Sequence, residues 1–297
     1  MMNVCRCLNC FCCKVHPSVR EESSGRALCR AAREGDYVHL HNEKRDYGCD
    51  LNGVDEEDGG STPLICACKF GHLQIVNWMV EHDVDPNIVD SENRTALLWS
   101  VKKGHLDIAR SLLRHFKGII DVDVQDKDGL AVLHIICMKR DITDEEAQLV
   151  EMILGVAKNI NSVETSSGFT PLHYACRYEH EQIVEKLLRS NASASVADKF
   201  GYQVLHWACR ANNFNIAKLI CEYASDVNMN FKTKEGMTPM AFATTYGTIE
   251  LTRYLAMKVC WTYVCVCVLF CSHTKSRIPL TSLRLRITGC IASFKIS

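Results

Sequence analysis

The sequence predicts an all-α fold made of stacked helix–turn–helix units. Six segments repeat one pattern, in which an opening similar to T-P-L is followed by small apolar residues and, in most copies, a basic residue. The segments begin at residues 62, 95, 131, 170, 203 and 238, so their starts are separated by 33, 36, 39, 33 and 35 residues. Self-similarity at such a period is typical of a solenoid, in which each unit packs only on its neighbours.

The segment that begins at Thr62 shows why each unit should form two helices. Thr62 is a suitable N-cap, and Pro63 fits the first helical turn. The apolar residues within 64–68 recur at helical spacing, and Gly71 is expected to end this helix. A second apolar stretch over 73–80 predicts the second helix, which must pack against neighbouring units to bury its apolar face.

These segments resemble the ankyrin repeat, whose pattern opens G-x-T-P-L-H and continues through A-A-x-x-G-H to an apolar second helix. The resemblance covers residues 26–258 and adds a first unit, whose first helix includes residues 28–36. It implies an ankyrin-repeat solenoid of seven units, the last one incomplete. Residues 1–25 are expected to be a disordered, cysteine-rich leader, and residues 259–297 an apolar and then basic tail without ankyrin-like sequence.

Three units are longer than 33 residues. The extra residues fall within 114–123, within 140–147 and just before Thr233. Insertions in solenoids map to loops, and such loops often bind partners. Neutral variation of a surface loop is the alternative, and it is the interpretation that we favour.

No catalytic or cofactor site is expected. The sequence contains no G-x-S-x-G, P-loop, H-E-x-x-H or G-x-G-x-x-G motif. Three histidines share the last position of T-P-L-H, where the resemblance implies hydrogen bonds to the backbone: His134, His173 and His206. Four cysteines share a position that requires a small buried side chain: Cys68, Cys137, Cys176 and Cys209. We therefore expect no enzyme activity, cofactor or metal.

The two ends of the chain allow other interpretations. Five cysteines lie close together near the start of the sequence: Cys5, Cys7, Cys10, Cys12 and Cys13. They could be lipidated or bind a metal as thiolates, and the alternative is an unstructured leader in which they have no role. The apolar run from Val259 to Cys271 is shorter than the roughly 20 residues that a membrane-spanning helix needs. A membrane-associated hairpin in this tail is an alternative.

Net charge and cysteine use bear on location and partner class. The formal net charge is −1, so only local charge can favour a charged partner. The cysteines of the repeats do not form a disulfide pattern, which favours a reducing, cytoplasmic location. Acidic residues at the hairpin tips argue against nucleic-acid binding.

The resemblance also implies that partners bind the hairpin tips and the exposed surface of the first helices, which together are expected to form a concave face. Five of seven units carry a basic residue at the first x of A-A-x-x-G-H. Basic and aromatic residues together predict an adaptor or scaffold that binds an acidic protein segment. A solvated polar face, a membrane-tethered module and a targeting subunit of an enzyme are the alternatives. The predicted partner-binding residues are Arg33, Lys69, Phe70, Lys102, Lys103, Lys139, Phe169, Arg177, Tyr178, Phe200, Tyr202, Arg210 and Tyr246.

Overall fold

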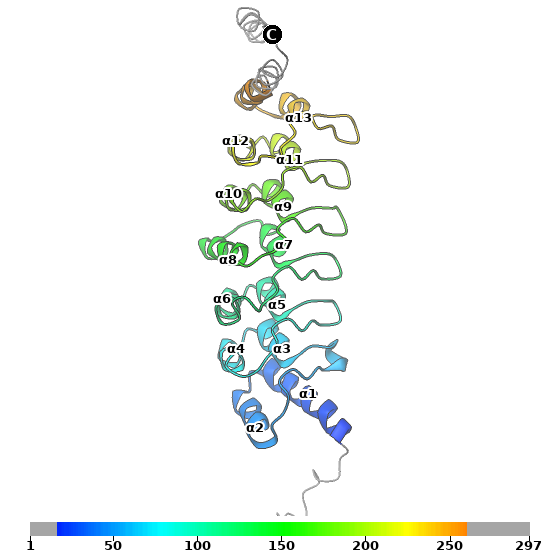
Figure 1. The fold of residues 1–297 in the computed structure, drawn as a ribbon, viewed down its shortest axis with the longest axis vertical. Coiled ribbons are helices and arrows are strands. Elements are labelled where there is room, and N and C mark those ends of the chain that lie inside the picture. Colours follow the sequence, from blue (N-terminus) through cyan, green and yellow to red (C-terminus); the bar gives the residue numbers. More distant parts are fainter. Residues whose placement is uncertain (1–16, 260–297) are drawn as a thin grey trace, which may run out of the picture. The chain divides into compact units, whose positions relative to one another are not determined.

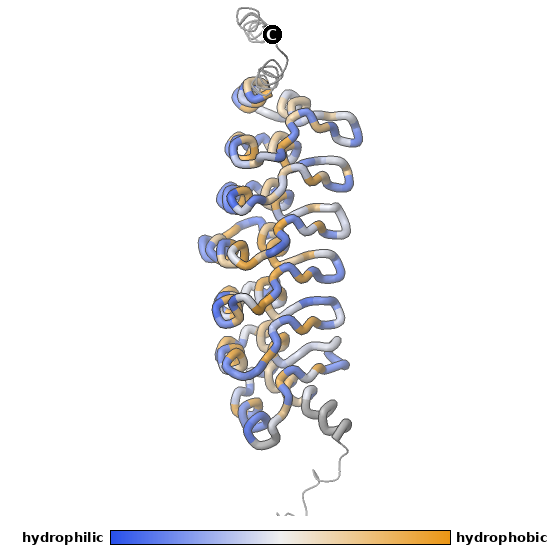
Figure 2. The backbone as a smooth tube through the Cα atoms, in the orientation of Figure 1, coloured by the Kyte–Doolittle hydropathy of each residue, from blue (hydrophilic) through white to orange (hydrophobic). Residues whose placement is uncertain are grey.

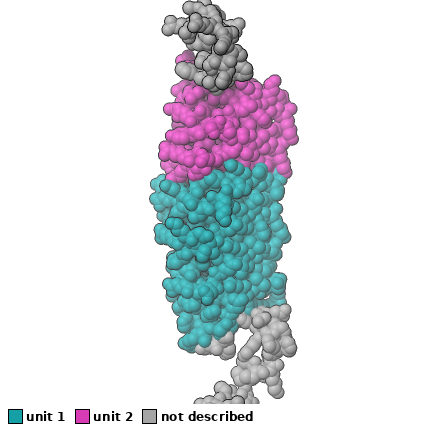
Figure 3. All heavy atoms as spheres, in the orientation of Figure 1, with its two compact units in different colours: residues 1–166 teal, residues 167–297 magenta. Residues whose placement is uncertain are grey.

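The computed structural model describes residues 17–259, and these residues form helices joined by turns and hairpin loops. Within this range there is no β-strand, and a single bridge pairs Asp55 with Ser61. The predicted all-α class is therefore confirmed. The chain divides into two compact units, residues 1–166 and residues 167–297 (Figure 3).

In the first unit, α3, α5 and α7 stack in one column, while α4, α6 and α8 form a second column beside them, on the left in Figure 1. Hairpin loops project from the first column. Helix α1 packs against α3 and α2 at the start of the unit. The helices are α1 (Pro17–Glu34), α2 (Tyr37–Tyr47), the short 3-10 helix η2 (Glu56–Asp58), α3 (Pro63–Phe70), α4 (Leu73–Met79), α5 (Ala96–Lys103), α6 (Leu106–His115), α7 (Val132–Cys137) and α8 (Asp144–Leu154).

The second unit repeats this arrangement. Helix α11 packs against α9 and α13, and α10 packs against α12 (Figure 1). A further helical segment, residues 249–259, supplies the second helix of the last repeat. The labelled helices are α9 (Pro171–Arg177), α10 (Glu181–Arg189), α11 (Val204–Arg210), α12 (Phe214–Tyr223) and α13 (Pro239–Tyr246).

Local sequence determines where the first helices begin and end. The Thr62 hydroxyl accepts a hydrogen bond from the Ile65 amide at 3.2 Å, and Pro63 occupies the first turn. Helix α3 ends at Gly71, whose φ of 86° lies in the left-handed region. A Cβ atom on Gly71 would also lie 2.7 Å from Cε1 of His105, so any larger residue would have to displace this imidazole as well.

Apolar side chains fill the space between the two columns of helices in each unit. Hydrophilic residues lie mainly along the hairpins and on the outer turns of the second helices (Figure 2). The four cysteines at the shared repeat position are completely buried, as predicted: Cys68, Cys137, Cys176 and Cys209. Burial raises the pKa of the Cys137 thiol to about 12, so this side chain behaves as a small apolar residue.

The repeated histidines join neighbouring repeats inside each unit. The Nδ1 atom of His134 accepts a hydrogen bond from the Ala131 amide at 3.1 Å, and its Nε2 donates to the Ser162 carbonyl at 3.0 Å. His206 makes the same pair of bonds, to the Gln203 amide and the Phe231 carbonyl, both at 3.1 Å. The expected bonding of the histidines to the backbone is confirmed.

The start of helix α1 and the insertion within residues 140–147 differ from, or add to, what the sequence predicts. Residues 17–25 were expected to belong to a disordered leader, but helix α1 already begins at Pro17. No helix breaker other than Gly25 lies between this proline and residue 28, and proline is favoured in a first helical turn. The insertion within 140–147 forms the loop before α8 and then the first turn of that helix, where Thr143 and Glu146 form a capping box.

Candidate partner-binding surfaces

A buried aspartate in the hairpin fixes the orientation of a tryptophan in each unit. In the first unit, Oδ1 of Asp90 accepts hydrogen bonds from the Glu92 and Arg94 amides, both at 2.9 Å. Its other oxygen, Oδ2, accepts from Nε1 of Trp99 at 2.8 Å. Burial alone would raise the pKa of Asp90, but these bonds and the Arg94 side chain outweigh it, so the pKa lies below its usual value.

The second unit contains the same arrangement. Asp198 accepts hydrogen bonds from the Phe200 amide at 2.9 Å and the Tyr202 amide at 2.8 Å. Its second oxygen accepts from Nε1 of Trp207 at 3.1 Å. Each tryptophan is thus held by its hairpin, and its ring orientation is set before any partner binds.

Four cations surround the ring of Trp99. The Arg94 guanidinium carbon lies 4.3 Å from the ring centroid, and Nζ of Lys69 lies 4.9 Å from it. The ammonium groups of Lys103 and Lys102 lie at 5.6 Å and 5.8 Å. These distances are typical of cation–π interactions. Arg33 lies nearby and pairs with Asp58, which is also 4.0 Å from Lys69. We call the following residues the Trp99 cluster: Trp99, Arg94, Lys69, Lys102, Lys103 and Arg33.

Two other predicted residues of the first unit differ in their surroundings. Phe70, at the end of α3, is 45% exposed and lies beside Lys69, whose Nζ is 5.8 Å from its ring centroid. Lys139 is half-buried and forms an ion pair with Glu146, itself 5% exposed. Because this pair joins the loop before α8 to the first turn of that helix, the structure gives Lys139 a role in holding that loop.

Arginine and aromatic side chains meet on the first helices and hairpins of the second unit. The guanidinium carbons of Arg177 and Arg210 each lie 5.5 Å from the Trp207 ring centroid. Arg177 is also 6.0 Å from the ring of Tyr178, and the ring of Tyr202 lies 5.5 Å from that of Trp207. Phe200 and Tyr246 are exposed in the same unit. We call the following residues the Trp207 surface: Trp207, Arg177, Arg210, Tyr178, Tyr202, Phe200 and Tyr246.

The prediction that Phe169 contacts a partner is wrong. Its side chain is only 2% exposed, because its ring packs between other aromatic rings of the second unit. The ring centroids of Tyr174 and Trp207 lie 5.1 Å and 5.3 Å away. Phe169 therefore belongs to the core beneath the surface, where it supports Trp207. The Arg177 guanidinium lies 5.6 Å from its centroid.

Sequence reasoning did not single out three residues that organise these surfaces. They are Arg94, Trp99 and Trp207, and a signal for the tryptophans was present. Both stand at the fifth position of the repeat pattern, and each follows an aspartate by nine residues. Two of the predicted basic residues, Lys102 and Arg210, stand three positions after these tryptophans on the same helix, which places them on the same helical face.

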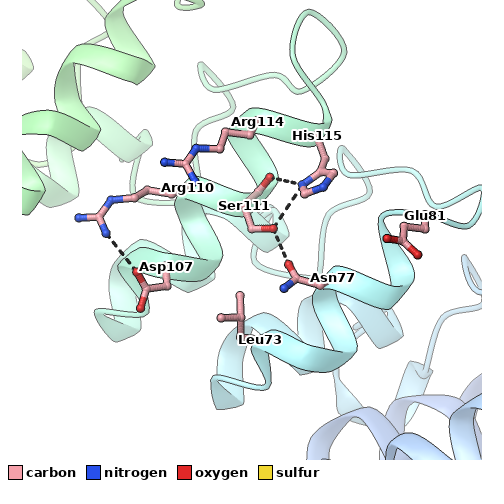
Figure 4. A pocket seen from close by; sticks show the side chains of 8 residues that line it. All are labelled: Leu73, Asn77, Glu81, Asp107, Arg110, Ser111, Arg114 and His115. Carbon is pink, nitrogen blue, oxygen red and sulfur yellow. Dashed lines mark hydrogen bonds and ion pairs between the residues drawn. The ribbon is translucent and has the colours of Figure 1, made fainter.

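A shallow groove also lies between α4 and α6 on the second helices of the first unit (Figure 4). Inside it, the Ser111 hydroxyl donates to Oδ1 of Asn77 at 2.6 Å, and Arg110 pairs with Asp107 at 3.1 Å. Its charged side chains carry both signs and include Glu81 and Arg114. This mixture does not select one class of ligand.

Other predictions concern metals, membranes and the chain ends. Among residues 17–259 there is no group of three or more histidine, cysteine or acidic side chains that could hold a metal ion. No helix in the described part of the chain has the length and apolar character needed to cross a membrane. The N-terminal cysteines and nearly all of the apolar tail lie outside the described residues.

Several known proteins share this architecture. The solved structure of the ankyrin repeat domain of Bcl-3, a member of the IkappaB protein family, superposes with a TM-score of 0.62 at 22% identity, covering 77% of this chain and 97% of that one. The ankyrin repeat domain of human ASB11 superposes with a TM-score of 0.55, also at 22% identity, covering 78% and 96%. At these identities the likeness shows the fold.

Sequence comparison identifies relatives that are much longer than this chain. The chain is 28% identical over 218 residues to the human transient receptor potential cation channel subfamily A member 1, and 30% identical over 197 residues to its Drosophila melanogaster counterpart. These matches cover 71% and 65% of this chain but only 19% and 16% of the channels. The family model for ankyrin repeats matches residues 28–126, 115–198 and 179–262. The chain therefore belongs to the ankyrin-repeat family.

Proposed function

We propose that this chain is an adaptor or scaffold that binds an acidic segment of a partner protein on the Trp207 surface. Ankyrin repeats generally mediate protein–protein interaction, and the fold is typically a non-enzymatic interaction module. The observation that carries the proposal is the pair of exposed guanidinium groups of Arg177 and Arg210 beside Trp207. Neither forms an ion pair with a carboxylate among the described residues.

The chemistry of this surface suits a carboxylate-bearing chain. A guanidinium presents a planar set of donors that can bind a carboxylate through two parallel hydrogen bonds. Tryptophan, tyrosine and arginine contribute most to binding energy in protein interfaces. Because Asp198 already holds the indole of Trp207, ordering this side chain on binding costs little further entropy.

Charge reversal tests the proposal. The intact chain and its R177E/R210E variant are used to capture proteins from lysate, and captured partners are then titrated by fluorescence polarisation. The matched control is K218E/R253E, which makes the same change of charge at exposed positions on the second helices of the same unit. We expect acidic partners to be lost only with R177E/R210E. Equal binding by both variants would show that the arginines are a solvated face.

A membrane-tethered module is the second candidate, and the five cysteines near the N-terminus favour it. Thioester-linked lipids are cleaved by hydroxylamine, whereas an apolar anchor is not. Release of the chain from membranes by hydroxylamine would support tethering through these cysteines. A chain that fractionates with soluble proteins under both conditions would exclude it. A cytoplasmic location is part of the main proposal, because small buried cysteines such as Cys68 and Cys137 suit a reducing compartment.

A further inference from the structure

The Trp99 cluster carries more positive charge than its own acids neutralise. Asp58 pairs with Arg33 at 2.5 Å and lies 4.0 Å from Lys69, while Asp90 pairs with Arg94 at 3.1 Å. These two carboxylates face five basic side chains, because Lys102 and Lys103 are also present. Among the described residues, neither of these two exposed lysines forms an ion pair with a carboxylate.

The unneutralised charge is concentrated in a small region. The ammonium nitrogens of Lys69, Lys102 and Lys103 all lie within 5.8 Å of one ring centroid. No two of them can therefore be farther apart than about 11 Å, a limit slightly above the Debye length of about 8 Å at physiological ionic strength. Salt therefore screens their mutual repulsion only in part, and a compact anion with more than one charge would relieve it.

We propose that these three lysines bind the phosphate group of a phosphorylated serine or threonine in a partner protein. A phosphate monoester carries a charge of about −1.5 to −2 and three acceptor oxygens. Three lysine ammonium groups can each donate to one oxygen, whereas a single carboxylate would neutralise only one of them. Arg94 and the Trp99 indole already donate hydrogen bonds to Asp90, and these bonds fix the ring beside which the three lysines lie.

A peptide segment fits this surface better than a membrane does. Phe70 is 45% exposed beside Lys69 and offers an apolar contact for a residue next to the phosphate. Exposed Glu56 lies in η2 of the adjacent hairpin, two residues before Asp58, while its neighbour Glu57 pairs with Arg26. Glu56 would repel an extended anionic surface, but it leaves room for one phosphate on a chain that is not otherwise acidic. The site is thus distinct from the Trp207 surface, which is proposed to bind carboxylates.

The test uses the intact chain and a degenerate peptide library that contains a fixed phosphoserine or phosphothreonine next to an apolar residue. Binding is measured by fluorescence polarisation and compared with the same library in unphosphorylated form and with glutamate in place of the phosphoresidue. The site variant is K102Q/K103Q, which removes charge from two exposed positions without introducing repulsion. The matched control, K117Q/K158Q, changes two exposed lysines elsewhere in the same unit.

Phosphorylated peptides should bind the wild-type chain about tenfold or more tightly than the other two forms, and K102Q/K103Q should lose about tenfold. K117Q/K158Q and R177E/R210E should bind within about twofold of wild type, which separates this site from the proposed function. Equal binding of phosphorylated and unphosphorylated peptides would overturn the inference, as would an unaffected K102Q/K103Q variant. Binding to phosphoinositide vesicles but not to phosphopeptides would assign the cluster to a membrane surface instead.

Discussion

Replacing Asp90 with asparagine tests whether the buried hairpin aspartate holds the Trp99 cluster together. Asparagine keeps Oδ1 and can still accept from the Glu92 and Arg94 amides. Its amide nitrogen replaces Oδ2, so it faces two donors, Nε1 of Trp99 and Nε of Arg94. Both hydrogen bonds are lost, and a buried indole N–H remains without an acceptor.

The expected cost follows from these contacts. Losing a hydrogen bond to a charged, buried acceptor costs about 1.5–3 kcal/mol. The Arg94 pair adds about 0.5–1 kcal/mol, because the arginine side chain is 20% exposed while the aspartate is 4% exposed. D90N should therefore lower the free energy of unfolding by about 2–4 kcal/mol in urea titrations monitored by far-ultraviolet circular dichroism.

Two controls make this result interpretable. D107N removes an exposed carboxylate that pairs with Arg110 at 3.1 Å, and it should cost about 0.5 kcal/mol or less. A double-mutant cycle between D90N and W99F should give a coupling energy of about 1 kcal/mol or more, since the indole N–H is the shared partner. A D90N variant within about 0.5 kcal/mol of wild type, or a coupling energy near zero, would refute the reasoning.

Three further predictions concern acid stability, thiol reactivity and backbone conformation. Burial lowers the pKa of His206, so this imidazole binds a proton more readily in the unfolded chain than in the folded one. As the pH falls below about 6.5, the free energy of unfolding should therefore decrease by up to about 1.4 kcal/mol per pH unit. H206Q should weaken this dependence in urea titrations at different pH, and an unchanged slope would contradict it. Because burial raises the pKa of Cys137 to about 12, iodoacetamide should label this thiol only after unfolding, whereas peptide mapping should find the half-buried Cys49 labelled in the folded chain. Both Gly71 and Gly104 have positive φ, but only a Cβ on Gly71 would meet another residue, at 2.7 Å from His105. G104A should lower the free energy of unfolding by about 1–2 kcal/mol, and G71A should lower it further. Thermal unfolding measures both variants, and equal decreases would show that contact with His105 does not contribute.

The repeat pattern allowed much of the fold to be predicted. Thr62 and Gly71 begin and end helix α3 as the sequence indicated, because capping depends on residues within one turn of the helix end. Cys176 and His173 are buried where the shared pattern placed them. The start of α1 at Pro17 was not predicted, because this part of the helix precedes the first recognisable repeat motif.

The candidate surfaces were predicted less completely. Arg177 and Arg210 are exposed on the first helices as expected, but Phe169, which precedes the T-P-L-H opening in the same way as Tyr202, is buried. Sequence position alone could not separate these two aromatic residues. Their exposure depends on neighbouring rings, such as those of Tyr174 and Trp207 around Phe169.

The sequence by itself determined the repeat, the helices and the residues of the core, because caps and apolar spacing act over a few residues within each unit. Tertiary structure alone decided which charged side chains are paired and which are available. Lys139 is held by Glu146, whereas Lys102 and Lys103 stand beside Trp99 without a carboxylate partner among the described residues. Such pairing depends on distances between side chains from different helices, and these distances exist only after the repeats have stacked.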